Sequence, residues 1–119
     1  MSTLYAFLGP HLIDALVDRL YDRINLDPEL SPFFRHLDLA QLRARMKTFL
    51  TIVTGGSTRP PADMRAAHQR SAREGMTDRH FDLVVGHLVA ELRAFSVPEE
   101  RIGELGTLVE SLRADVLNR

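Results

Sequence analysis

Apolar side chains recur at spacings of three and four residues along almost the whole chain, and no stretch alternates apolar and polar residues for long. This period places the apolar side chains on one face of an α-helix, where they pack into a core. Four such stripes run over residues 12–24, 39–53, 81–95 and 102–116. We therefore expect an all-α chain of four long helices and two short ones. Its 119 residues suit one domain, spanning 1–119, with a modest core.

Capping residues mark where these helices begin. Small polar side chains accept hydrogen bonds from the free N–H groups of a first helical turn, and proline is tolerated there. The expected N-caps are Asp27, followed by Pro28, then Asp38, Thr77 and Ser96, the last in a capping box with Glu99 and with Pro98 in the first turn. The segment from Gly55 to Pro61 is too rich in Gly and Pro to continue a helix, so we expect a loop there. A short helix from about Met64 to Ala72 should follow it.

Composition and charge exclude several functional classes. The chain has no cysteine, which removes disulfides, thiolate catalysis and cysteine-based metal sites. Its formal net charge is −1 and its charges are interspersed, so neither nucleic acid nor a membrane is expected as a partner. No apolar run approaches the ~20 residues that span a bilayer, and residues 1–10 do not read as a secretory signal. We expect a cytoplasmic protein that is a monomer or a weak dimer.

The five histidines are the residues best suited to ligate a metal. A histidine in a helix is more often a surface or hydrogen-bonded core residue than a ligand. His68 differs because it lies on the short helix directly after the Gly/Pro loop, a segment with few packing ties that can aim an imidazole inward. For His80 and His87 we expect partial exposure and hydrogen bonds to neighbours. The sequence contains no phosphate-binding loop and no His-Glu-x-x-His motif.

Two aromatic positions stand out beside the histidines. Tyr21 lies close to the apolar stripe of the first long helix, and its hydroxyl needs a partner if it is buried. Phe33 and Phe34 follow Pro32, and such a pair is usually core unless a planar ligand lies against it. Met46, in the middle of a stripe, is likewise expected in the core. The pattern alone indicates a helical domain without assigned chemistry.

Five segments follow one another along the chain, and they are Leu20–Ile24, Asp27–Pro28 with Pro32–Phe34, Phe49–Leu50 leading to Gly55–Gly56, Met64–His68, and Thr77–Asp82. Taken in this order, they resemble the group I truncated haemoglobins of cyanobacteria and bacteria. The resemblance extends from Leu4 to Asn118, which is essentially the full length. It implies a truncated two-over-two helical globin sandwich that encloses haem b.

The resemblance also implies the roles of individual residues. His68 matches the proximal ligand, a neutral imidazole bonded to iron through one ring nitrogen. Phe34 matches the phenylalanine that packs on the porphyrin face, and Tyr21 matches the distal tyrosine whose hydroxyl donates to a bound ligand. Gly55 and Gly56 match the loop glycines of the family. The residues implied to line the haem are Phe34, Leu42, Arg45, Met46, Phe49, His68, Phe81 and Val85.

The chain departs from the family on the distal side. Relatives often carry glutamine at the positions of Leu42 or Met46, so Tyr21 is the only obvious donor above the iron here. Arg45 replaces a histidine that ligates iron in some relatives, and we expect its guanidinium to pair with a haem propionate; the alternative is that it turns inward to the ligand. Without that histidine we expect a ferrous iron with an open sixth position. If the iron is six-coordinate instead, the thioether of Met46 is the first candidate for the sixth ligand. We expect no covalent link to a haem vinyl group, because Leu112–Ala114 offers no histidine.

These implications lead to three functional hypotheses. The first is reversible binding of dioxygen, and of other diatomics such as NO and CO, in oxygen storage or transport. The alternative is nitric oxide dioxygenation, or a weak peroxidase activity, which needs an external electron donor because the chain carries no flavin or nicotinamide domain. The third is an interaction module that has lost haem, against which the retention of His68, Phe34 and Tyr21 argues.

Overall fold

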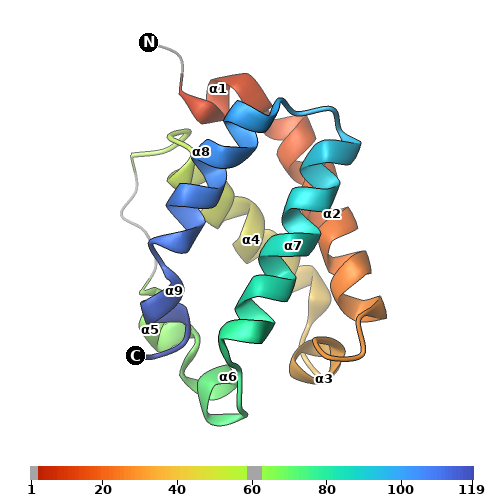
Figure 1. The fold of residues 1–119 in the computed structure, drawn as a ribbon, viewed down its shortest axis with the longest axis vertical. Coiled ribbons are helices and arrows are strands. Elements are labelled where there is room, and N and C mark those ends of the chain that lie inside the picture. Colours follow the sequence, from red (N-terminus) through yellow and green to blue (C-terminus); the bar gives the residue numbers. More distant parts are fainter. Residues whose placement is uncertain (1–2, 59–62) are drawn as a thin grey trace.

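The computed structural model describes residues 3–58 and 63–119, and all regular structure within these ranges is helical (Figure 1). The long helices are α2 Pro10–Leu26, α4 Leu39–Val53, α7 Asp78–Ala94 and α8 Glu99–Glu110. The short ones are α1 Leu4–Leu8, α3 Ser31–Phe34, α5 Met64–Ala67, α6 Gln69–Arg73 and α9 Arg113–Val116. The first three predicted stripes each lie on one long helix and the fourth is shared by α8 and α9, which confirms the all-α prediction. None of the described helices is both long and apolar enough to cross a bilayer.

The four long helices form two packed pairs. Helix α2 packs against both α4 and α7, and α7 packs in turn against α8, so that α2 and α4 cover α7 and α8 (Figure 1). Helices α3, α5 and α6 lie together at one end of the molecule, and α1 lies at the other. This is the two-over-two arrangement that the family resemblance implies.

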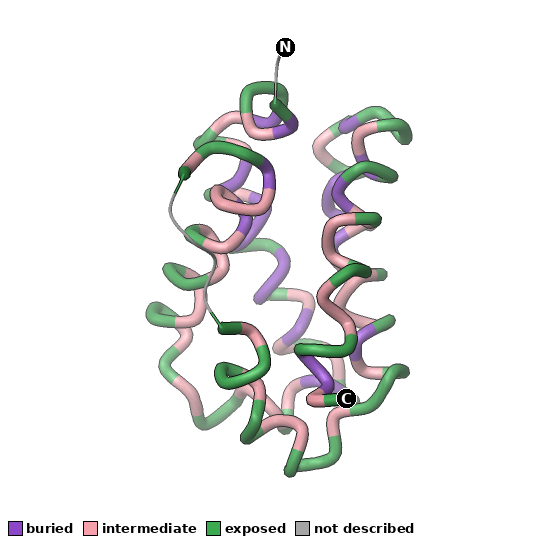
Figure 2. The backbone as a smooth tube through the Cα atoms, turned by 90° about the vertical axis from the view of Figure 1, so that its left-hand side faces the viewer, coloured by how far each residue is buried: buried purple, intermediate pink, exposed green. Residues whose placement is uncertain are grey.

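Helices α2 and α4 are covered to very different degrees. Six residues of α2 are buried: Ile13, Leu16, Val17, Leu20, Tyr21 and Ile24. Helix α4 carries an equally regular apolar stripe, yet within it only Leu50 is buried. Buried positions follow the central helices in Figure 2, with intermediate and exposed positions around them. Part of the apolar face of α4 is therefore left without protein contacts.

Two of the predicted caps are confirmed. The side chain of Asp38 accepts a hydrogen bond from the backbone N–H of Gln41 at 3.2 Å and caps α4. Thr77 is the N-cap of α7, and its own N–H donates to His80 Nδ1 at 3.0 Å. The imidazole of His80 thus takes the place of the carboxylate that usually closes a capping box.

The other two predicted caps are wrong. Asp27 ends α2 instead of beginning a helix: its carboxylate accepts from the N–H of Glu29 at 2.9 Å and stabilises a turn before α3. Ser96 ends α7 in the left-handed region, with φ of 60°. The N–H of Val97 donates to the Leu92 carbonyl at 3.0 Å, so Ser96 occupies the place that glycine usually takes at a helix C-terminus. Helix α8 begins after Pro98.

The predicted short helix and the last long helix are each interrupted. The stretch from Met64 to Ala72 divides at His68 into α5 and α6, where φ is −110° and ψ is 10°. The last stripe divides at Ser111–Leu112 into α8 and α9. The predicted loop from Gly55 to Pro61 begins directly after α4, and its residues 59–61 lie outside the described residues.

The glycines that end α4 bring the chain close to α1. Gly55 has φ of 96°, a conformation that other residues resist. A Cβ atom on Gly56 would lie 2.5 Å from the ring of Tyr5, so only glycine fits there. The backbone N–H of Tyr5 donates to the carbonyl of Thr54 at 2.9 Å and fixes this contact.

Candidate functional site

His68 lies between α5 and α6 and is half-buried. Its Nδ1 atom lies 2.8 Å from the backbone carbonyl oxygen of Met64. A carbonyl only accepts hydrogen bonds, so Nδ1 is the protonated nitrogen and donates. The other ring nitrogen, Nε2, then carries the lone pair, which is the form in which a neutral imidazole ligates a metal.

Tyr21 lies on α2 with only 4 % of its surface exposed. Burial raises the pKa of Tyr21 to about 12, although the Arg43 guanidinium lowers it in part. The phenol is therefore a neutral O–H donor throughout the physiological range. Within the described part of the chain the structure shows no hydrogen bond from this hydroxyl, so it is free to donate to a ligand.

Phe34, at the end of α3, packs edge-on against Tyr21. The two ring centroids lie 6.2 Å apart, and the ring planes are inclined by 75°. The fold thus brings together two of the predicted site residues from different helices. Phe33 points elsewhere, since its ring packs against that of His80 at 4.9 Å.

The predicted lining residues fall into two groups. Those from α3 and α4 are partly buried against the main core cluster, and they are Phe34, Leu42, Met46 and Phe49. Those from α7 belong to a smaller cluster with Met64, Val116 and Leu117, and they are Phe81 and Val85. The predicted lining residues therefore belong to two separate apolar clusters, and the smaller one also contains Met64, whose carbonyl oxygen contacts His68 Nδ1. Arg45 is exposed on α4.

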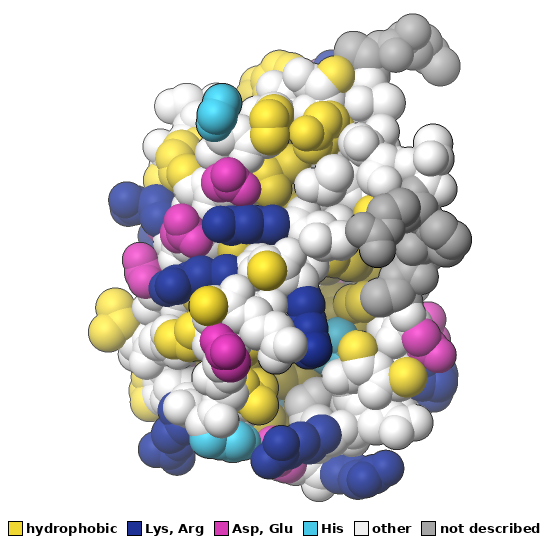
Figure 3. Space-filling view, turned by 180° about the vertical axis from the view of Figure 1, so that it is seen from behind, with side chains coloured by type: hydrophobic (Ala, Val, Ile, Leu, Met, Phe, Trp, Pro, Cys, Tyr) yellow, Lys and Arg dark blue, Asp and Glu magenta, His cyan; other side chains and the backbone are white. Residues whose placement is uncertain are grey.

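These residues fit a haem. An imidazole with a free Nε2 supplies the donor, and the half-covered stripe of α4 supplies an apolar face that the protein itself leaves open. Figure 3 shows the side of the molecule opposite to Figure 1, where hydrophobic side chains and a histidine lie in a hollow with Lys or Arg side chains beside it. A flat apolar group with charged edges matches such a surface.

The remaining histidines have local partners or lie in solvent. His80 bonds to Thr77, as described above, and His87 Nε2 lies 2.8 Å from Asp27 Oδ2. The hydrogen bond with His87 is the main cause that holds the pKa of Asp27 below its usual range. Partial exposure and bonds to neighbours were the expectation for both residues, and it is confirmed. His11 and His36 are exposed.

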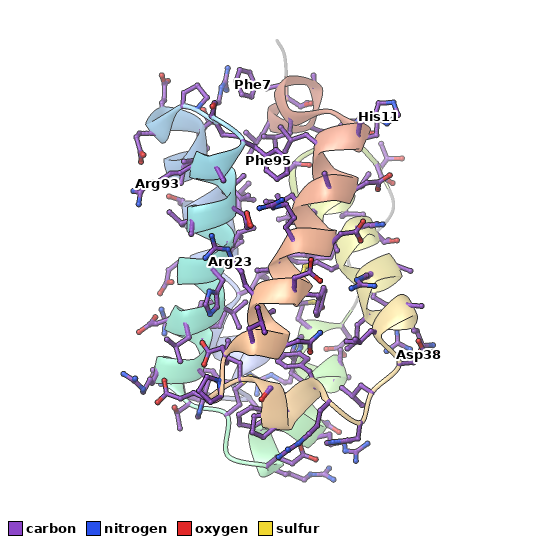
Figure 4. The ribbon with its side chains drawn as sticks, turned by 90° about the vertical axis from the view of Figure 1, so that its right-hand side faces the viewer. Phe7, His11, Arg23, Asp38, Arg93 and Phe95 are labelled. Carbon is purple, nitrogen blue, oxygen red and sulfur yellow. The ribbon has the colours of Figure 1, made fainter. Side chains whose placement is uncertain are left out.

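A carboxylate is buried between α2 and α7, and the sequence pattern does not predict its burial. Glu91 is 2 % exposed, and Nε of Arg19 donates to it at 3.1 Å. Nε of Arg23 also lies 3.1 Å from the same oxygen, and Figure 4 shows Arg23 in the space between the two helices. Burial raises the pKa of Glu91, but the two guanidinium groups outweigh burial and hold it below its usual range. In the sequence Glu91 looks like one more charge on an amphipathic helix.

Arg113 joins the start of α9 to α7 beneath the smaller cluster. Its guanidinium stacks over the ring of Phe81, 4.4 Å from the centroid. It also pairs with Asp78 at 3.0 Å and with Glu110 at 2.7 Å. Hydrogen bonds to Glu110, to Asp82 and to Asp78 raise the pKa of Arg113 above its already high usual value. One face of Phe81 is therefore occupied by the protein itself, and its position is fixed.

Comparison with known proteins agrees with this architecture. A family model described as bacterial-like globin matches residues 3–118. Group 1 truncated hemoglobin GlbN of Synechocystis sp. is 37% identical over 124 aligned residues, which cover 100% of both chains. Group 1 truncated hemoglobin LI410 of Chlamydomonas moewusii is 34% identical, with 98% of this chain and 68% of that protein covered.

Solved structures show the same fold. The 2/2 hemoglobin of Synechococcus sp. PCC 7002, solved in the cyanomet state with covalently attached heme, has a TM-score of 0.94 at 36% identity and covers 99% of this chain and 100% of that one. The truncated hemoglobin of Tetrahymena pyriformis, in the Fe(III) form, has a TM-score of 0.89 at 27% identity, with 98% of both chains covered. A family match over nearly the whole chain, together with full-length relatives above 30% identity, shows that the chain belongs to the bacterial-like globins and, among them, to the group 1 truncated haemoglobins.

Proposed function

We propose that this haem-binding globin carries haem b, holds it through His68, and reversibly binds dioxygen and other diatomic ligands such as NO and CO. The observation that carries the proposal is the hydrogen bond between His68 Nδ1 and the Met64 carbonyl, which leaves Nε2 free. When bound, the haem supplies an iron centre that takes up a diatomic ligand in its open position. The residues of this chain set the ligation, the polarity and the access of the site.

The His68–Met64 hydrogen bond orients the proximal side. A carbonyl acceptor fixes the imidazole in one tautomer and one ring orientation, and it makes the ligating nitrogen more basic. Because His68 lies at an interruption of the helix, its side chain is not restricted to the orientation that a regular helix would impose. We therefore assign His68 as the proximal ligand.

Tyr21 is the proposed donor on the distal side. The side chain is buried, and its neutral hydroxyl makes no hydrogen bond within the described residues, so donation to a ligand of partial negative charge satisfies it. Leu42 and Met46 offer no strong hydrogen bond from α4. The stabilisation of a bound ligand then depends on one hydroxyl, and retention of dioxygen is expected to be moderate.

Nitric oxide dioxygenation is the second candidate. The half-buried apolar side chains of α4 suit the entry of a second small, uncharged ligand beside a bound dioxygen. Turnover would consume one electron per cycle from an external donor. Rapid mixing of the oxygenated protein with nitric oxide, in wild type and Tyr21→Phe, tests it: stoichiometric nitrate formed faster than the mixing time supports the candidate, and slow oxidation without nitrate contradicts it.

Absorption spectra with added haem test the main proposal. We expect wild type to bind one haem per chain and to give the carbon monoxide spectrum of a histidine-ligated globin in the reduced state. His68→Ala should lose this spectrum, whereas His36→Ala, which alters an exposed histidine, should keep it. An unchanged spectrum in His68→Ala would contradict the ligand assignment. Full extraction of the haem by acidified organic solvent would support a cofactor that is not covalently attached.

A further inference from the structure

The charges of the chain are divided between two parts of its sequence. Residues 31–75, which contain α3, α4, α5 and α6, carry eight Lys and Arg against three Asp and Glu, a net charge of +5. The rest of the chain carries seven against thirteen, a net charge of −6. The formal net charge of −1 conceals this division. The basic part contains His68 and the two helices on either side of it, α5 and α6.

Three arginines of the basic part have no ion pair within the described residues, and all three are exposed: Arg35, Arg45 and Arg73. They differ in this from the other cations described in the same part. Those are paired with carboxylates, as Arg43 and Lys47 are with Asp18, and Arg65 with Asp115. The positive charge of an exposed guanidinium that has no carboxylate partner is not neutralised, so it can attract an approaching anionic partner.

Two of the unpaired arginines belong to the end of the molecule where α5 and α6 flank His68, and the third lies on α4. Arg35 directly follows α3 and Arg73 ends α6, and these two helices occupy the same end of the molecule (Figure 1). Arg45 lies on α4 between Leu42 and Met46. Figure 3 shows Lys and Arg side chains gathered along the lower part of the hollowed face. We define the basic rim as Arg35, Arg45 and Arg73.

We propose that the basic rim docks a small acidic one-electron carrier protein. The inference rests on the proposed function, since a haem globin needs an external donor to return to the ferrous state. Two propionate carboxylates on a bound haem would still leave a charge of +3 on residues 31–75. In the transfer the carrier is oxidised by one electron and the globin is reduced by one, with no atom exchanged. Docking at a rim beside the haem site would keep the distance between the redox centre of the carrier and the haem short, which favours electron transfer.

An acidic protein fits this surface better than a polyanion does. Thirteen carboxylates on the remainder of the chain repel a long nucleic acid or an extended anionic membrane, which would meet them as well as the rim. A compact protein with one acidic patch touches the rim alone. Complementary charges of this kind steer association and fix orientation more than they add affinity.

The test measures binding of the haem-loaded protein to plant-type [2Fe–2S] ferredoxin, an acidic one-electron carrier, with both proteins oxidised. Each variant first has its carbon monoxide spectrum checked. Titration calorimetry at low salt should give a complex that weakens as ionic strength rises. The double variant Arg35→Glu/Arg73→Glu should bind about 30-fold more weakly. The rate of haem reduction by reduced ferredoxin should fall in parallel.

The matched control reverses two arginines away from the rim. Arg93→Glu/Arg101→Glu changes the net charge equally, and both side chains lie at the end where α1 is found, since Arg101 stacks on Phe7 and Figure 4 shows Arg93 and Phe7 there. This control should bind within about threefold of wild type. Equal weakening in the control would overturn the proposal, because net charge and not the rim would then govern binding.

Other outcomes separate this proposal from the one on which it rests. A normal carbon monoxide spectrum without ferredoxin binding overturns the docking surface alone. Binding of phosphatidylserine vesicles or duplex DNA that the rim variant loses, in place of ferredoxin binding, overturns the acidic carrier as the partner. Failure of wild type to take up haem contradicts the proposed function itself.

Discussion

The Nδ1 atom of His68 lies 2.8 Å from the carbonyl oxygen of Met64, one helical turn earlier in the chain. Met64 is the first residue of the four-residue helix α5, and the N–H of His68 donates to the Arg65 carbonyl at 3.3 Å instead of to the Met64 carbonyl. The Nδ1 contact turns the free nitrogen of the imidazole outward from the backbone. The backbone of α5 therefore fixes the tautomer and orientation of the His68 imidazole in the absence of a cofactor.

The first prediction concerns replacement of this imidazole from solution. In His68→Gly the backbone remains and leaves a cavity of the shape of the ring. We expect the variant to lose the histidine-ligated carbon monoxide spectrum and to regain it in the presence of millimolar imidazole. The same addition to His36→Gly should change nothing, because that residue is exposed. If imidazole does not restore the spectrum, the lost residue is not the iron ligand.

The second prediction concerns the distal hydroxyl. Tyr21→Phe removes a donor whose hydrogen bond to a partly charged acceptor contributes about 1.5–3 kcal/mol. We expect dioxygen to dissociate about tenfold to a hundredfold faster, as measured by stopped-flow displacement. Dissociation of carbon monoxide, whose oxygen carries less negative charge, should change little and serves as the control. An unchanged rate for dioxygen would show that the hydroxyl does not reach the ligand.

The third prediction follows from the pKa of Tyr21, which burial raises to about 12 from the ordinary value of 10.0. Between these values the folded protein holds a proton that the unfolded chain has lost, so stability falls as pH rises. The contribution is complete below pH ~10, and a loss approaching 2–3 kcal/mol is expected near pH ~12. Urea unfolding from pH 8 to 11.5 should show a steeper decline for wild type than for Tyr21→Phe. Parallel declines would contradict the assignment.

The fourth prediction concerns the carboxylate buried between α2 and α7. Glu91→Gln leaves two guanidinium groups without their partner, but their side chains are 60% and 40% exposed and remain partly hydrated. We expect a loss of about 1–3 kcal/mol in the free energy of unfolding. Glu99→Gln breaks an exposed pair with Arg93 and should cost less than about 1 kcal/mol. An equal cost in both variants would mean that burial adds nothing to the Glu91 pairs.

The same carboxylate predicts a dependence on acid. Because the pKa of Glu91 is lowered on folding, its contribution is complete above the ordinary value of 4.5 and is lost as pH falls through the folded value. The difference in stability between wild type and Glu91→Gln should therefore shrink below pH 4.5. A difference that stays constant into acid would contradict the lowered pKa.

The fifth prediction concerns the glycine beside Tyr5. Gly56→Ala places a methyl group 2.5 Å from the ring, so the ring or the chain must move. We expect a loss of about 1–3 kcal/mol, most of which a Tyr5→Ala background should remove. Gly106→Ala is the matched control, since its added methyl meets open space on α8 and should stabilise the helix by up to about 1 kcal/mol. Additive effects of the Tyr5 and Gly56 changes would exclude the steric clash.

Local chemistry was enough to predict the long helices but not all of their ends. A stripe of apolar residues has one period whether or not a partner helix covers it, so α2, α4, α7 and α8 follow from spacing. The N-cap predictions at Asp27 and Ser96 are wrong because Asp and Ser occur at both ends of helices and in turns. Ser96 adopts a left-handed conformation that ends α7, and this choice depends on how the chain turns into α8.

The site required more than the pattern of residues. One histidine among five became a ligand candidate through its place after a loop and through family resemblance, since no local rule separates His68 from His36. The structure adds the Met64 carbonyl, which is invisible in a sequence because every residue has one. It also shows that the stripe of α4 is only partly covered by protein.

The sequence by itself determined the helical class, the four apolar faces and the supply of an imidazole, a phenol and a phenylalanine that suit a haem. Each of these depends on interactions within about one helical turn or on the identity of a side chain. Only the tertiary structure decided which groups meet: Tyr21 with Phe34, and Glu91 with an arginine 72 residues away. Such contacts arise when separate helices pack, and packing depends on the shape and burial of whole faces, which no local spacing encodes.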